Sequence, residues 1–128
     1  MTNKNYSIAV ITCWYGKYPW YINYFLHSCS FNSTIDFFII TDNLNSLPNK
    51  PENVKIIYKS ISEIKTNASQ KLGFNVNIDY PYKLCDFKPA YGFLFPEIIE
   101  GYDFWAQSDL DVIFLSADLR SFSLTFLS

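Results

Sequence analysis

The amino-acid sequence predicts an α/β layered domain with a mostly parallel central sheet. Three short apolar runs rich in β-branched residues, 7–12, 36–42 and 54–58, have the pattern of strands that are buried on both faces. A helical pattern follows the first run, and a helix-capping pattern follows the third. This alternation is typical of parallel sheets, which bind their ligands at the carboxyl ends of the strands.

The first run is expected to be a central strand, and Gly16 and Pro19 mark the loop that follows it. Pro19 suits the first position of a helix. From Trp20 to about Cys29, apolar residues recur at helical spacing and predict an amphipathic helix. We expect His27, in this helix, to be a surface or core residue rather than a ligand.

The second run ends in a polar pair, Thr41 and Asp42, and a loop over residues 43–53 leads to the third run. Ser60 and Glu63 then have the spacing of a capping box, in which each side chain bonds the other's backbone amide. A second helix is therefore expected to begin just after Ser60.

The segment before the last strand has weaker signals. Residues 71–82 contain Gly73 and Pro81 and predict irregular structure. Residues 82–95 predict a helix with a kink at Pro89. A turn at 101–103 then leads into a fourth strand at 104–108.

Length, charge and cysteine content limit the class of protein. The 128 residues fit one domain, and 49% hydrophobic residues are enough for a substantial core. A net charge of −2 without any basic run argues against a nucleic-acid partner. The three cysteines, Cys13, Cys29 and Cys85, form no C-x-x-C pair, so we expect reduced, buried thiols. No apolar stretch approaches the roughly 18 to 20 residues of a transmembrane helix, and we expect a cytoplasmic protein.

Asp109 and Asp111 stand one residue apart at the end of the fourth expected strand. In an extended segment they would share one face, about 6 to 7 Å apart, with Leu110 turned away. Two such carboxylates can hold one hard divalent cation, which removes the repulsion between them. Spacing alone leaves a second interpretation open, in which Ser108 and Asp109 begin a turn and Asp111 caps whatever follows.

Several of these segments together resemble a known family. The residues are Thr41–Asp42, the run Tyr82-Lys83-Leu84-Cys85-Asp86-Phe87-Lys88-Pro89-Ala90-Tyr91-Gly92, and Phe104–Trp105 followed by Asp109-Leu110-Asp111. From about Ile8 to Phe122 the chain resembles bacterial glycosyltransferases of the GT-A type, a Rossmann-like nucleotide-sugar transferase fold that includes enzymes of capsule and lipopolysaccharide synthesis. The resemblance implies metal-dependent transfer of a sugar from a nucleotide-sugar donor to a glycan or lipid-linked acceptor.

The resemblance also implies roles for particular residues. Asp111 would be a direct ligand of Mn²⁺ or Mg²⁺, and Asp109 would share the metal or contact the ribose. Lys83, Asp86 and Lys88 would reach the donor sugar and its phosphates. An ordinary solvated helix face is the alternative interpretation for these three.

The loop after the first strand would contact the nucleoside by the same resemblance. Thr12, Trp14 and Tyr15 are the candidates there, and either ring can stack on a base. The alternative is an aromatic lid over the core. Asp42 would hydrogen-bond the base or ribose, or would only start the turn into Asn43.

The chain departs from the family in length after the aspartate pair. Only residues 112–128 follow Asp111, whereas family members continue into an acceptor-binding half. We therefore expect residues 1–128 to be a single donor-binding domain with an incomplete sheet, the N-terminal part of a longer glycosyltransferase. The full-length enzyme would associate with the membrane only peripherally. A non-catalytic nucleotide-sugar-binding module and an inactive truncated remnant are the alternatives.

Overall fold

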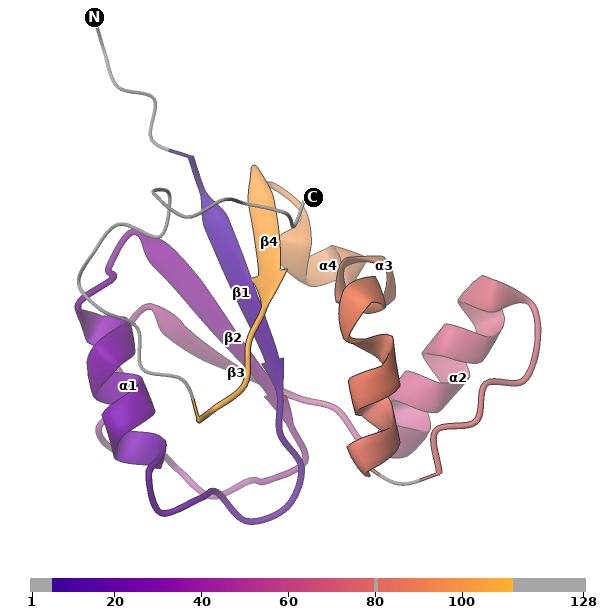
Figure 1. Ribbon diagram of the computed structural model, residues 1–128, viewed down its shortest axis with the longest axis horizontal. Helices are drawn as coiled ribbons and strands as arrows, with labels where there is room; N and C mark the ends of the chain where they lie inside the picture. The colour runs from indigo at the N-terminus through magenta and orange to yellow at the C-terminus, as the bar shows by residue number, and fades with distance from the viewer. Residues whose placement is uncertain (1–5, 80, 112–128) are drawn as a thin grey trace, which may run out of the picture.

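A four-stranded, all-parallel sheet forms the centre of the computed structural model, which describes residues 6–79 and 81–111 (Figure 1). The strands are β1 (Ile8–Cys13), β2 (Ile35–Thr41), β3 (Val54–Tyr58) and β4 (Phe104–Gln107). Their order across the sheet is β3-β2-β1-β4. The predicted α/β layered fold with a parallel sheet is thus confirmed.

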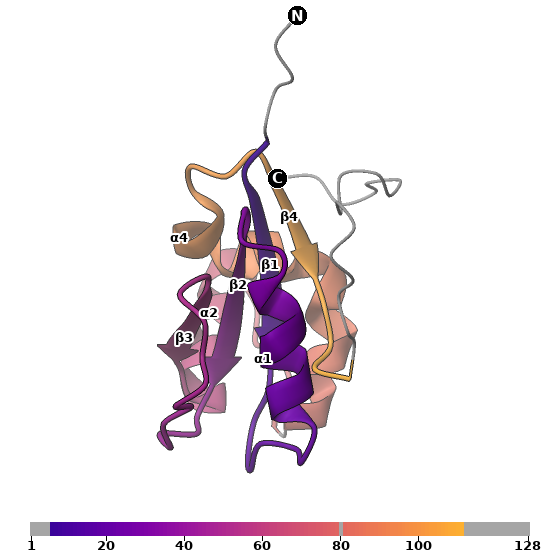
Figure 2. The same ribbon diagram turned by 90° about the vertical axis from the view of Figure 1, so that its left-hand side faces the viewer.

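Helices cover both faces of this sheet (Figures 1 and 2). Helix α1 (Ile22–Ser30) lies on one face. On the other face lie α2 (Ile61–Leu72), the 3₁₀ helix η1 (Pro81–Ala90), α3 (Tyr91–Leu94) and α4 (Pro96–Ile99).

Successive residues of β1 pack into two different cores. Ile8 and Val10 contact the cluster on the α1 side, whereas Ala9 and Ile11 contact the cluster beneath α2, α3 and α4. All four side chains are at most 3% exposed. Because both faces of the strand are covered, its sequence is a continuous apolar run rather than an alternating one.

Local signals placed the second helix correctly. Ser60 Oγ accepts from the Glu63 amide at 3.0 Å, and the Glu63 carboxylate accepts from the Ser60 amide at 3.2 Å. The helix ends at Gly73, whose φ of 77° is the left-handed conformation that glycine adopts without strain.

Two predicted helices differ from the structure. The first begins at Ile22 rather than at Trp20, because the Ile22 amide still bonds the Pro19 carbonyl in a turn. The continuous helix over 82–95 is wrong: the chain forms η1, then α3, then α4. Pro89 and Pro96 each lack an amide hydrogen, and Phe95, just before Pro96, lies outside the α region (φ −125°, ψ 57°).

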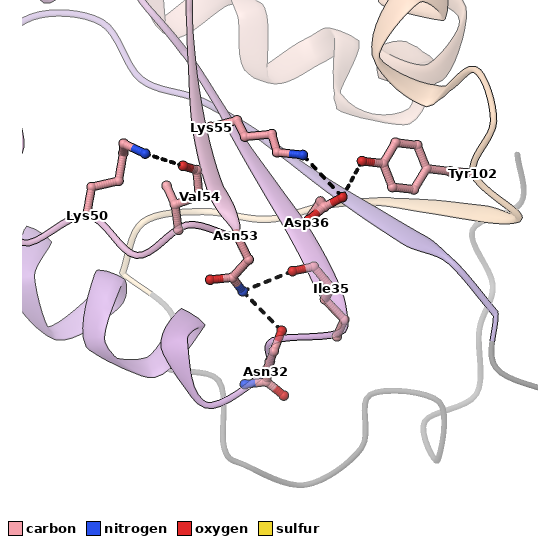
Figure 3. A network of polar contacts seen from close by, with 8 residues as sticks. All are labelled: Asn32, Ile35, Asp36, Lys50, Asn53, Val54, Lys55 and Tyr102. Carbon is pink, nitrogen blue, oxygen red and sulfur yellow. Dashed lines mark hydrogen bonds and ion pairs between the residues drawn. The ribbon is translucent and has the colours of Figure 1, made fainter.

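The amino ends of the strands are held by a polar network (Figure 3). The Asn53 amide lies 3.0 Å from the carbonyl of Ile35 and 3.1 Å from that of Asn32. Asp36 accepts the Tyr102 hydroxyl and pairs with Lys55 at 3.4 Å. Burial and the bond to Asp36 raise the pKa of Tyr102. This end of the sheet is therefore tied together by its own side chains.

Candidate functional site

The strand order marks the carboxyl ends of β1 and β4 as the place where a ligand is expected. The chain runs outward from β1 to β2 and β3, then returns to add β4 on the other side of β1. In open parallel sheets, ligands bind where the strand order reverses in this way. Residues that follow β1 and β4 are therefore the first candidates for a site.

The aspartate pair comes directly after β4. The Ser108 amide donates to the Ile11 carbonyl at 3.0 Å, so pairing with β1 continues to the start of the motif. Leu110 is 1% exposed within the core on the α1 side, while Asp109 and Asp111 are exposed. Leu110 and Asp111 lie in a turn rather than in an extended strand. The turn left open from the sequence is thus present, and whatever Asp111 would cap lies outside the described residues.

Asp109 forms an ion pair with Lys88 of η1. The Lys88 ammonium lies 2.6 Å from Asp109 Oδ1, and the two side chains are 27% and 53% exposed. Two residues predicted for the same site, 21 positions apart in sequence, are therefore brought together. The pair balances charge at the edge of the sheet, and water screens it enough that its contribution to stability is small.

A glycine allows α3, the helix that directly follows η1, to lie close to β4. Gly92, in α3, lies against the indole of Trp105 in β4 so closely that a Cβ there would be 2.5 Å from Trp105 Cε2. Helix α3, which directly follows the segment that carries Lys88, therefore packs on β4, the strand that leads into Asp109. Sequence reasoning missed this contact.

The other two members of the predicted phosphate-binding group lie in the same 3₁₀ helix. Lys83 is half-buried, and the side chain of Asp86 lies outside the described side chains. At three residues per turn, Lys83 and Lys88 leave η1 on different sides. Of the side chains that the structure describes in this group, that of Lys88 contacts the aspartate pair.

The carboxylates of Asp109 and Asp111 suit a cation that a bound phosphate group also coordinates. Within residues 6–79 and 81–111, no three His, Cys, Asp or Glu side chains are grouped so as to hold a metal ion. Mg²⁺ is, however, commonly held by one or two carboxylates together with substrate phosphates. Asp109 and Asp111 are carboxylates of that kind, and the Lys88 ammonium lies 2.6 Å from one of them.

The loop after β1 carries the predicted nucleoside contacts. Thr12 is only 2% exposed and lies within the sheet. Trp14 packs against the α1-side core and donates its indole N–H to the Lys17 carbonyl at 2.9 Å. Tyr15 packs against the opposite core. Both rings are only partly buried, so each keeps an accessible part.

Two phenol hydroxyls of this loop are buried. The Tyr15 hydroxyl has no hydrogen-bond partner among the described residues, whereas the Tyr18 hydroxyl lies near Thr41, whose side chain lowers the pKa that burial raises. Burial is the main cause that raises the pKa of Tyr15, so its hydroxyl keeps its proton as a donor. An unpaired buried hydroxyl costs about 1–3 kcal/mol. Tyr18 was not among the residues predicted for the site.

Asp42 holds the same loop in place. Its carboxylate accepts from the Gly16 amide at 2.9 Å, and Asn43 Nδ2 donates to the Gly16 carbonyl at 3.0 Å. Gly16 has a φ of 91°, which disfavours any side chain there. Asp42 therefore positions the loop after β1, and the accompanying role of Asn43 was not predicted.

None of the helices in the described part of the chain combines the length and apolar character needed to cross a membrane.

Comparisons with known proteins leave the activity open. Neither a curated protein nor a solved structure matches the chain. A family model does match, over residues 10–123, and the chain belongs to that family, DUF6625, a family of unknown function.

Proposed function

We propose that this domain binds a nucleotide sugar at the carboxyl ends of β1 and β4, as the donor domain of a metal-dependent glycosyltransferase of the GT-A type. The acceptor would be a glycan or a lipid-linked acceptor in the synthesis of a surface polysaccharide in the cytoplasm. The observation that carries the proposal is the Lys88–Asp109 pair beside Asp111, at the point where the strand order reverses.

The ion pair suits a diphosphate. Lys88 neutralises Asp109 in the absence of a ligand and can turn its ammonium toward an incoming phosphate, because both side chains are partly exposed. A lysine supplies a point charge without the bidentate geometry of arginine. Lys83 and Asp86 of the same helix are proposed for the remaining phosphate and sugar contacts.

Asp109 and Asp111 supply the carboxylates for Mn²⁺ or Mg²⁺. Bound there, the cation would stabilise the negative charge that develops on the departing nucleoside diphosphate. Leu110 fixes the turn between the two carboxylates by packing into the core. The positions of Asp109 and Asp111 are thus set by the fold before a ligand arrives.

The nucleoside would meet the loop after β1. Trp14 and Tyr15 are partly exposed, so either ring could stack on the base. Asp42 holds the loop through Gly16, and its exposed carboxylate keeps a second oxygen for a ribose hydroxyl. Thr12 would act only as a buried support for this loop.

Thermal unfolding in the presence of Mn²⁺ and a panel of nucleoside diphosphates tests the proposal. A ligand at a hundredfold excess over its dissociation constant stabilises the folded state by about 2.7 kcal/mol, or a rise of about 10 °C for a chain of this size. We expect such a rise with one nucleotide, dependent on Mn²⁺ and lost in Asp111→Asn.

Asp79→Asn is the matched control. Asp79 also pairs with a lysine, Lys65, at 3.0 Å and is 59% exposed, but it lies outside the proposed site. This variant should keep the full rise. A chain that melts cooperatively and is stabilised by no nucleotide would refute the donor site. If the nucleotide binds but the sugar nucleotide is never turned over, the domain is a binding module.

A further inference from the structure

The outer face of α1 carries an aromatic groove that is separate from the edge of the sheet described above. The groove has a volume of about 370 Å³ and lies between α1 and the loop that joins β2 to β3. Its lining residues are Asn23, Tyr24, Leu26, His27, Ser30 and Asn49.

Large aromatic rings extend this groove along the surface. Trp20 is 83% exposed, Tyr24 62% and Phe31 57%. Trp20 and Tyr24 pack edge to face at 6.2 Å, and His27 and Phe31 do so at 4.9 Å. Two pairs of exposed rings along one helix are typical of a surface that binds something.

The groove offers two side-chain amides, which carry no charge. Among the residues that the structure describes, no Lys, Arg, Asp or Glu side chain lines it. The side-chain amides of Asn23 and Asn49 have no hydrogen-bond partner within residues 6–79 and 81–111. Each amide can both donate and accept, as can the imidazole of His27.

From this chemistry we infer that the α1 groove binds a neutral oligosaccharide. Sugar rings present apolar C–H faces to aromatic side chains and hydroxyl groups, which both donate and accept, to amides. A lining without charge suits a ligand without charge. The absence of Lys and Arg from α1 argues against an anionic membrane surface, which attracts basic residues.

Saturation-transfer NMR and calorimetry with a panel of neutral hexasaccharides test this inference. The panel contains glucose-, galactose-, mannose- and N-acetylhexosamine-based chains. We expect one of them to bind, with an affinity that does not change between low and high salt. Tyr24→Ala and Asn23→Ala should each weaken binding tenfold or more.

Phe74→Ala is the matched control for Tyr24→Ala. Phe74 is an aromatic residue outside the groove and is 63% exposed, close to the 62% of Tyr24. This variant should bind as the native chain does, and so should Asp111→Asn, which separates the groove from the donor site. Cooperative unfolding of each variant verifies that it folds. Absence of binding at millimolar hexasaccharide, or binding that Tyr24→Ala leaves unchanged, overturns the inference. Self-association of the native chain that Tyr24→Ala abolishes also overturns it, because the face would then be a contact between two copies.

Discussion

Replacing Gly92 by alanine tests how tightly α3, the helix that directly follows the segment with Lys88, is packed against β4. A Cβ at position 92 would lie 2.5, 2.6 and 2.9 Å from three atoms of the Trp105 indole. Carbon atoms prefer to be about 3.5–4.0 Å apart. The ring or the helix must therefore move by roughly 1 Å, and the indole itself packs against the core on this face of the sheet.

The steric cost should exceed the gain in helix propensity. Overpacking of this kind costs about 1–3 kcal/mol. Alanine is favoured over glycine within a helix by at most about 1 kcal/mol. We expect Gly92→Ala to lower the free energy of unfolding by about 1–2 kcal/mol and the unfolding midpoint by roughly 4–8 °C. Nucleotide affinity should fall too, because Lys88 shifts relative to Asp109.

Urea unfolding followed by far-ultraviolet circular dichroism measures this effect without depending on tryptophan fluorescence. The transition should move to lower urea with an unchanged slope. In a Trp105→Leu background, which removes the indole, Gly92→Ala should cost much less, since the two residues are directly coupled. If Gly92→Ala is as stable as the native chain, or its penalty is unchanged without the indole, the packing argument is wrong.

Three further predictions concern single residues. Burial raises the pKa of the Cys29 thiol to about 12, so the unfolded chain releases this proton at lower pH than the folded chain. The free energy of unfolding should therefore fall between pH 9 and 12. Calorimetric unfolding midpoints should fall less steeply over this range in Cys29→Val. Asn53→Ala should destabilise the fold by about 1–3 kcal/mol in urea titrations, because the carbonyls of Cys29, Asn32 and Ile35 lose a shared donor; an effect below about 0.5 kcal/mol would mean that water replaces the amide. Lys88→Gln should change the free energy of unfolding by less than about 1 kcal/mol, as expected for an exposed ion pair, yet weaken the binding of a nucleoside diphosphate. Lys65→Gln, which removes a similar pair elsewhere, should leave that binding unchanged in the same calorimetric titration.

The features that sequence predicted well are those set by neighbouring residues. The run from Ile8 to Thr12 identifies a buried strand by itself, because each face of the strand meets a core. Ser60 and Glu63 identify a helix start because both partners of the capping box lie within one turn. The segment over 82–95 failed for the opposite reason: Pro89 and Pro96 interrupt its hydrogen bonding, so periodicity alone could not define its helices.

The candidate site depended on contacts between distant segments. The resemblance selected Lys88 and Asp109 separately, but only the folded chain brings the two side chains together. Glycine at position 92 carries no local signal for a tryptophan 13 residues later. Asp42 likewise binds a glycine 26 residues before it, so its part in holding the loop could not be inferred from the turn it begins.

The pairing of β1 with β4 also determines when the domain can finish folding. Ser7 and Asp103, which join the starts of these two strands, are 96 positions apart in sequence. As the chain is synthesised, one edge of β1 stays unpaired until β4 emerges, and contacts over such separations form slowly. That edge is exposed to wrong partners in the meantime. The proposed site at the carboxyl ends of β1 and β4 can form only once this pairing is made, so a nucleotide bound there would also report that the chain has completed its sheet.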